Sequence, residues 1–157
     1  MKRFYKKGLI YPFFFFLLLL YLTNGADRML EIGMKGEQTL TVDGTNTADV
    51  YKSGELPVFA TPAMIGLMEF TASQSVAKEL AAGQSTVGTR IDVKHVAATP
   101  VGMQVTCISE LTEIDRRRLV FRVQAMDDCG IIGEGIHERF IIDREKFLER
   151  TYGKKEK

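Results

Sequence analysis

The chain has 157 residues, of which 45% are apolar, and this is enough for one domain with a sizeable core. Its 21 basic residues nearly cancel its 20 acidic ones, so no overall field attracts nucleic acid or an anionic membrane surface. The two cysteines, Cys107 and Cys129, have the spacing of neither a metal knuckle nor a redox pair, which argues against metal and disulfide chemistry.

The first 28 residues have the composition of a targeting segment. Basic residues precede an apolar run from Leu9 to Leu22, which is of signal-peptide length and shorter than the roughly 20 residues of a spanning helix. A secretory leader or membrane anchor is one interpretation, and a start assigned too far upstream of Met29 is the other. We therefore expect a leader-like segment over residues 1–28, one domain over 29–150 and a charged tail over 151–157.

Residues Val58–Gly83 predict one long buried helix. Thr61 can act as its N-cap and Pro62 as its first helical residue, and Gly83 is a typical stop. Apolar side chains cover so much of the circumference that the first half should be buried nearly all round. Glu69 lies within that half, and no basic residue one turn away can pair with it. Its carboxylate is then a desolvated, reactive acid, a rim residue that points at solvent, or a structural acid bonded to a neighbouring strand.

Alternating segments on both sides of this helix predict antiparallel strands. One short strand lies within residues 36–44 and is followed by a polar flap. Four further strands follow the helix and are joined by tight turns. Their expected bounds are Thr86–Thr99, Met103–Ile114, Arg118–Asp127 and Ile131–Asp143. Strict alternation in the first of these places His95 on the apolar face with Ile91 and Val93.

This order of elements predicts an α+β fold in which an antiparallel sheet wraps around one long central helix. A single helix can bury its whole circumference only if the sheet curls round it. A dimer whose sheets join edge to edge would also remove an exposed edge strand.

Three residues on the helix and the next strand stand out as candidate catalytic groups: Thr61, Glu69 and His95. Hydroxyl, carboxylate and imidazole are the parts of an acyl-transfer site, where a base or nucleophile attacks a carbonyl and a donor holds the oxyanion. Each also has a structural interpretation, because Thr61 can serve only as an N-cap and an inward His95 can be a hydrogen-bonded core residue.

Three stretches carry a resemblance to a known family: VFATPAMIGLMEF, VGTRIDVKHVAATPVGMQV and GIHERFII. Together they resemble the hotdog-fold acyl-CoA thioesterases, and most closely the fluoroacetyl-CoA thioesterase group, over roughly residues 36–147. The catalytic threonine, glutamate and histidine of that group match Thr61, Glu69 and His95. Its substrate-contacting glycine and arginine match Gly88 and Arg139.

The resemblance implies hydrolysis of a short acyl-CoA thioester by a homodimer, without metal or other cofactor. Glu69 would attack the carbonyl or activate water, and the sequence leaves both open. His95 would shuttle a proton, and Thr61 would orient the carboxylate or the substrate. Gly88 would let its backbone lie against the acyl group. Arg139 would anchor a CoA phosphate or be an inward-paired structural arginine.

The flap departs from the fluoroacetyl-CoA thioesterase pattern. Phenylalanines form a hydrophobic lid there in that group, whereas the matching segment here is YKSGELP, with Lys52 and Glu55 at those places. We therefore expect a general short-chain or aryl acyl-CoA thioesterase that has lost the preference for fluoroacetyl groups.

Two other classes of function remain as alternatives. A hotdog hydratase needs an aspartate and a histidine about five residues apart, whereas Asp92 and His95 are three apart and face opposite ways. A non-catalytic acyl-CoA-binding module or sensor would keep the pocket without the reactive groups. A cytoplasmic location fits a CoA thioester as substrate; a membrane-anchored or exported protein is the alternative if residues 1–28 are translated.

Overall fold

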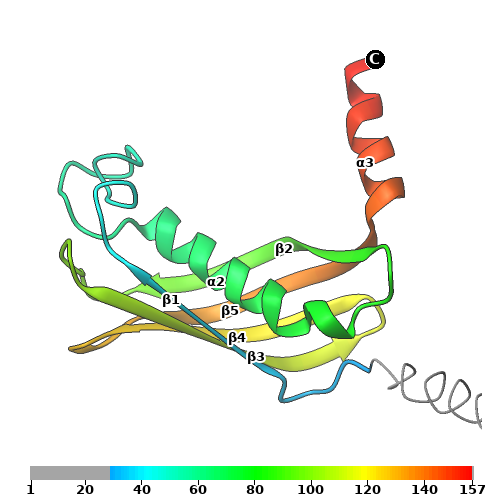
Figure 1. Ribbon diagram of the computed structural model, residues 1–157, viewed down its shortest axis with the longest axis horizontal. Coiled ribbons are helices and arrows are strands. Elements are labelled where there is room, and N and C mark those ends of the chain that lie inside the picture. The colour runs from blue at the N-terminus through cyan, green and yellow to red at the C-terminus, as the bar shows by residue number, and fades with distance from the viewer. Residues whose placement is uncertain (1–28, 157) are drawn as a thin grey trace, which may run out of the picture.

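The computed structural model describes residues 29–156, so the predicted leader lies outside the described residues. Five strands and one long helix form the body of the protein, and a shorter helix follows at the C-terminal end (Figure 1). The strands are β1 (Lys35–Thr41), β2 (Gln84–His95), β3 (Gln104–Asp115), β4 (Arg118–Asp127) and β5 (Gly130–Asp143). The helices are α2 (Thr61–Val76) and α3 (Arg144–Tyr152), with single 3₁₀ turns at Ala77–Glu79 and Gly153–Glu156.

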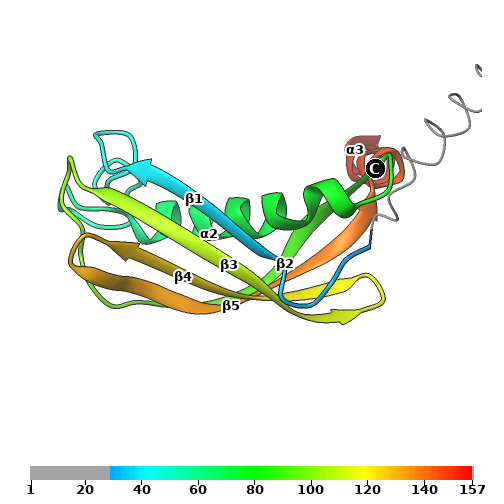
Figure 2. The ribbon, with the colours of Figure 1, turned by 60° about the horizontal axis from the view of Figure 1, so that its bottom comes forward.

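All five strands join one antiparallel sheet in the order β1-β3-β4-β5-β2. The sheet curves around α2, which lies along its concave face (Figure 2). Tight turns connect β3 to β4 and β4 to β5, so these strands are neighbours in both sequence and space. This arrangement confirms the predicted α+β fold with a sheet wrapped on one helix, and it leaves β2 as an edge strand.

The hydrophobic core lies between one side of α2 and the concave face of the sheet. The helix contributes Ala63, Met64, Leu67, Met68, Ala72 and Val76 to this core. The opposite side is open, because Gly66 and Phe70 are exposed and Ile65 is only half-buried. The prediction that the first half of the helix is buried nearly all round is therefore wrong for a single chain, since one sheet contacts only one side of a helix.

The start of α2 also differs from the prediction. Ala60, and not Thr61, occupies the N-cap position, and no side chain caps the helix there. Thr61 is the first helical residue, with Pro62 beside it, where a missing N–H costs no hydrogen bond. The predicted end at Gly83 is wrong, because α2 ends at Val76 and only a 3₁₀ turn continues it to Glu79. Gly83 lies in the turn before β2, where its φ of +82° is a left-handed conformation that glycine adopts without strain. The Thr61 hydroxyl is thus free to bond elsewhere.

The strand β2 contains a β-bulge at Thr89. Gly88 pairs with Arg139 and Arg90 with Glu138, so Thr89 is an extra residue in the ladder with β5. Alternation before the bulge turns Thr86 toward the helix, and alternation after it turns Ile91, Val93 and His95 the same way. The prediction of strict alternation throughout this strand is therefore wrong at one residue, although the predicted facing of His95 holds.

Residues 42–60 form a flap over the N-terminal end of α2. Isolated bridges pair Thr47 with Phe59 and Val58 with Pro100, which ties the flap to the turn before β3. The Phe59 and Thr47 side chains are buried, whereas Tyr51 and Leu56 at the tip are exposed. The predicted flap thus packs on the N-terminal end of α2 through its buried residues and exposes its tip to solvent.

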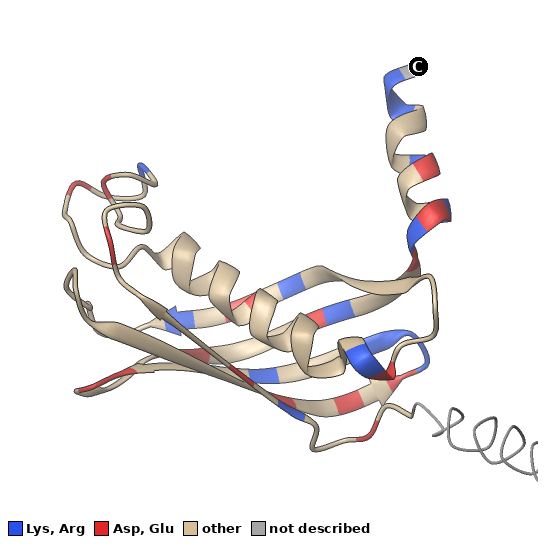
Figure 3. Cartoon of the chain, in the orientation of Figure 1, with Lys and Arg blue, Asp and Glu red and all other residues tan. Residues whose placement is uncertain are grey.

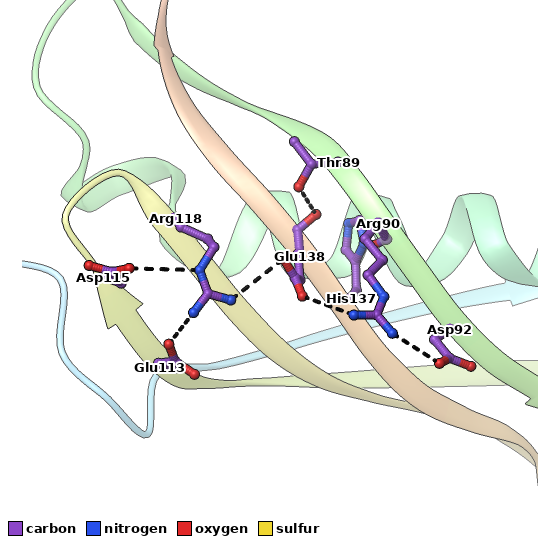
Figure 4. A network of polar contacts seen from close by, with 8 residues as sticks. All are labelled: Thr89, Arg90, Asp92, Glu113, Asp115, Arg118, His137 and Glu138. Atoms are coloured by element: carbon purple, nitrogen blue, oxygen red, sulfur yellow. Dashed lines mark hydrogen bonds and ion pairs between the residues drawn. The ribbon is translucent and has the colours of Figure 1, made fainter.

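Charged side chains lie mainly on the strands and on α3, and Glu69 is the single charged residue in the sequence of α2 (Figure 3). On the outer face of the sheet, arginines and acids alternate across β3, β4, β5 and β2 (Figure 4). Glu138, for example, lies between Arg118 at 3.5 Å and Arg90 at 3.7 Å. This ladder of exposed pairs is typical of a face that remains in water.

Within residues 29–156, no helix is both long enough and apolar enough to cross a membrane.

Candidate active site

The first pair of candidate groups, Thr61 and His95, is in direct contact. Oγ1 of Thr61 lies 2.8 Å from Nδ1 of His95, joining the first turn of α2 to the last residue of β2. Burial lowers the pKa of His95, so its imidazole is neutral at neutral pH. Nε2 of His95 has no hydrogen-bond partner within the described residues. The ring therefore has one nitrogen fixed by the hydroxyl and one buried nitrogen without a partner in this part of the chain.

A cavity of about 300 Å³ adjoins this pair beneath the flap. Its lining residues are Ala48, Ser53, Val58, Phe59, Thr61, His95, Val96, Ala97 and Ala98. Most of these side chains are small and apolar, and the polar atoms of Thr61 and His95 lie at one side. A cavity with an apolar wall and a few convergent polar groups is typical of a small-molecule site.

The Glu69 carboxylate lies on the open side of α2, against Gly88 of β2. A Cβ placed on Gly88 would overlap Oε1 of Glu69 and would stand 3.2 Å from Cε1 of His137. Only glycine leaves room for the carboxylate there. The Glu69 side chain is 44% exposed, so in a single chain it is less desolvated than the sequence predicts. The carboxylate therefore lies against the strand and is accessible from solvent.

Two buried polar residues of β5 complete the surroundings of Glu69: His137 and Arg139, which are 0% and 6% exposed. Arg139 donates from Nε to Oγ1 of Thr86 at 2.8 Å and from Nη2 to the Thr86 carbonyl at 2.9 Å. Its Nη1 lies 3.3 Å from the backbone carbonyl of Glu69 and 3.0 Å from Nε2 of His137. Burial with these partners favours the inward-paired alternative for Arg139 over the phosphate anchor.

His137 is the functional candidate that sequence reasoning missed. The quoted motif GIHERFII contains it, but only Arg139 was singled out. The available signal was the alternation of β5, which turns His137, Arg139 and Ile141 to the same buried face. Two polar residues at inward positions of a strand indicate a buried polar cluster, because such groups need partners there.

The candidate catalytic residues form two groups within one chain, and these groups are not in contact. Thr61 and Glu69 are eight residues apart on α2, a separation of about 12 Å along the helix axis. The hydroxyl contacts His95, whereas the carboxylate contacts Gly88 and lies 3.7 Å from Nε2 of His137. A single chain therefore does not assemble the predicted constellation of Thr61, Glu69 and His95.

A curled five-stranded antiparallel sheet around one long helix is the hotdog fold, and this chain shares it with the thioesterase superfamily. A superfamily member from Thermus thermophilus superimposes with a TM-score of 0.76 at 25% identity, covering 82% of this chain and 96% of that one. Residues 42–145 match the family model described as fluoroacetyl-CoA-specific thioesterase, so the chain belongs to that family. Both the predicted fold and the predicted family resemblance are confirmed.

Two relatives within that family carry the comparison further. The curated fluoroacetyl-CoA thioesterase of Streptantibioticus cattleyicolor is 48% identical over 90 residues, which are 57% of this chain and 65% of that protein. The match thus spans somewhat less than two thirds of that relative's length. A solved structure of a fluoroacetyl-CoA thioesterase superimposes with a TM-score of 0.76 at 38% identity, covering 80% of this chain and 98% of that one.

Proposed function

We propose that this protein hydrolyses acyl-CoA thioesters to the free acid and CoA. The observation that carries the proposal is the accessible Glu69 carboxylate that lies against Gly88, where the absence of a side chain leaves room for the carboxylate. The 48% identity to a curated fluoroacetyl-CoA thioesterase supports the same chemistry.

The geometry is compatible with two routes, both of which begin at the Glu69 carboxylate. In the first, the carboxylate attacks the thioester carbon, expels the CoA thiolate and forms a mixed anhydride that water then hydrolyses. In the second, the carboxylate removes a proton from water, which adds to the carbonyl directly. In the second route the neutral His95, oriented by Thr61, relays to the departing thiolate the proton that Glu69 takes from water. In the first route His95 donates a hydrogen bond to the carbonyl oxygen, and the thiolate takes a proton released when water hydrolyses the anhydride. No cofactor or metal takes part in this proposal.

A homodimer is part of the proposal, because it would bring the two separated groups together. The open side of α2 and the free edge of β2 lie on the same side of the chain, and a second copy can cover both. A two-fold axis near Ile65, midway between Thr61 and Glu69, places the Thr61–His95 pair beside Glu69 of the partner subunit. Gly66 lies next to that point and has no atom within 4 Å of the position of a Cβ, which suits a close helix crossing.

The dimer is tested by sedimentation of the protein and two arginine variants. We expect the wild-type protein to sediment as two chains and Gly66→Arg to sediment as one, because a long charged side chain blocks the crossing. The matched control is Glu134→Arg, since Glu134 is exposed on the outer face of the sheet. A dimeric Gly66→Arg protein with wild-type activity would contradict this arrangement.

For the acyl group, we propose short-chain or aryl substrates without a preference for fluoroacetyl. Lys52 and Glu55 are exposed on the flap and place charge where a hydrophobic lid is expected for fluoroacetyl selectivity. The small apolar side chains that line the 300 Å³ cavity leave space for a group larger than acetyl. Much faster turnover of fluoroacetyl-CoA than of acetyl-CoA would overturn this specificity.

The decisive assay is release of free thiol from acetyl-, fluoroacetyl-, butyryl- and phenylacetyl-CoA by the protein begun at Met29. We expect turnover that Glu69→Gln abolishes, because the amide keeps the shape of the side chain and removes its charge and basicity. Glu134→Gln makes the same change on the exposed outer face and should leave turnover intact. CoA esters that bind without being hydrolysed would instead support the alternative of a binding module or sensor.

The proposed substrate also favours a cytoplasmic location. A protein that hydrolyses CoA thioesters must meet them, and an exported one would find little CoA. The structure does not describe residues 1–28 and so does not test where translation starts. The N-terminal sequence of the protein isolated from its source tests the proposed start at Met29.

A further inference from the structure

His137 is a completely buried histidine to which the proposed reaction assigns no step. It lies on β5 between the bulged part of β2 and the helix, beside Arg90 in Figure 4. Nδ1 of the ring is 2.8 Å from the carbonyl oxygen of Arg90, and Nε2 is 3.0 Å from Nη1 of Arg139. Both ring nitrogens are therefore engaged by protein groups.

These two contacts define the protonation state of the ring. A guanidinium has only donors, so Nε2 of His137 must accept the hydrogen bond from Arg139. The ring proton then lies on Nδ1 and is donated to the Arg90 carbonyl. The imidazole is neutral and is held as the Nδ1–H tautomer by a strand on one side and by an arginine on the other.

The neutral state of His137 affects Glu69, because both residues lie among the same charged groups. Arg139 and Glu138 on β5 and Glu69 on α2 act on the ring, while β2 contributes the Arg90 carbonyl. Oε1 of Glu69 is 3.7 Å from Nε2, which is beyond hydrogen-bond range, so the carboxylate stays unpaired while Arg139 occupies that nitrogen. Burial and the nearby Arg139 charge both lower the pKa of His137, so the neutral form persists at neutral pH.

We propose that His137 is a positioning residue: its neutral Nε2 holds Nη1 of Arg139 so that the guanidinium braces the backbone of Glu69 and does not close onto the Glu69 carboxylate. This inference rests on the proposed function of Glu69 as nucleophile or base. An arginine paired directly with that carboxylate would stabilise the anion and weaken it in both roles.

Two amide variants separate the contacts of the ring. His137→Gln can place an amide oxygen near the position of Nε2 and keep an acceptor for Arg139. His137→Asn reaches only the position of Nδ1 and leaves Nη1 of Arg139 without that acceptor. We expect the glutamine variant to keep most of the wild-type kcat and the asparagine variant to lose roughly 10- to 100-fold in kcat with little change in KM. The acid limb of the kcat/KM profile should move to lower pH in the asparagine variant alone.

A measurement on the wild-type protein tests the inference without using activity. The chain has two histidines, so comparison with His137→Gln assigns the ring-nitrogen NMR signals of His137. We expect a single Nδ1–H tautomer that is neutral at pH 7, because Nε2 accepts the hydrogen bond from Arg139. A protonated ring, or a proton on Nε2, would overturn the proposal even if the asparagine variant fails to fold.

The possible failures are distinguishable. If the wild-type protein hydrolyses no CoA ester, the proposed function fails, and the inference that rests on it fails too. If the wild-type protein is active and Glu69→Gln is not, but folded His137→Asn keeps wild-type kinetics, only the role of His137 is refuted. Equal losses in both amide variants with an unmoved acid limb would mean that His137 serves packing alone, which also refutes the proposed role.

Discussion

Substitution of Gly88 by alanine is the most direct perturbation of the Glu69 carboxylate. The added methyl group would occupy the position of Oε1 and stand 3.5 Å from Cδ of Glu69, so the carboxylate must move away from β2. The backbone of Gly88 does not have a positive φ, and alanine is therefore compatible with the strand itself. Gly88→Ala should therefore displace the Glu69 carboxylate without distorting the backbone of β2.

The magnitude follows from the displacement that the methyl group requires. To restore ordinary van der Waals contact the carboxylate must shift by about 1 Å, and a displacement of this size in a reacting group costs on the order of 100-fold in rate. That loss equals about 2.7 kcal/mol of transition-state stabilisation. Because the Glu69 side chain is 44% exposed, it can move toward solvent, and we expect the free energy of unfolding to change by only about 1 kcal/mol.

Thiol-release kinetics and thermal unfolding together check this prediction. Gly88→Ala should lose kcat and keep nearly the wild-type unfolding midpoint. Gly153→Ala is the matched control, since a Cβ at Gly153 meets no atom within 4 Å. Wild-type kcat in the Gly88 variant would refute the placement of the reactive carboxylate against this residue. A change confined to KM would show that Gly88 contacts only substrate.

The hydroxyl of Thr61 and the two histidines give further predictions. Thr61→Val should lose roughly fivefold to tenfold in kcat, which is the equivalent of one hydrogen bond of about 1 kcal/mol to His95. Thr61→Ser keeps the hydroxyl and should keep the wild-type kcat. Equal kcat values for the valine and serine variants would contradict a catalytic hydroxyl. Burial lowers the pKa of both His95 and His137, so below about pH 6.5 the unfolded chain binds protons that the folded protein does not. The unfolding midpoint should therefore fall as pH falls through this region, and His137→Gln should show a weaker dependence; the same slope in both proteins would disprove the contribution of His137.

Much of the fold could be predicted because the strands of the hairpin region alternate apolar and polar residues over most of their length and are bounded by turn residues. The predicted bounds of β4, Arg118–Asp127, are those observed. The tight turn at residues 116–117 pairs Asp115 with Arg118 and so sets the register of this hairpin up to one bulge between Leu111 and Glu113. Local signals were sufficient there because neighbours in sequence are neighbours in the sheet.

The site could be predicted only in part, because its geometry depends on contacts between distant elements. The apolar circumference of α2 suggested burial on all sides, yet one chain covers one side and leaves Phe70 51% exposed. Periodicity places His137 and Arg139 on the inner face of β5, but it does not show that Arg139 bonds Thr86, the backbone of Glu69 and Nε2 of His137 there. These arrangements arise from the pairing of β2 with β5, which no local pattern encodes.

The bulge at Thr89 explains a spacing that would otherwise be inconsistent with a β-strand. Gly88 and His95 are an odd number of positions apart, so in a regular strand they would face opposite sides of the sheet. The extra residue restores both to the helix side. Deleting Thr89 would therefore remove the bulge and leave the facing of the later residues of β2 unchanged, because Gly88 and His95 would then be an even number of positions apart and Arg90 would still pair with Glu138. In sequences of this kind, an odd number of positions between the glycine and the histidine is a signal, readable from the sequence alone, that the strand contains a bulge.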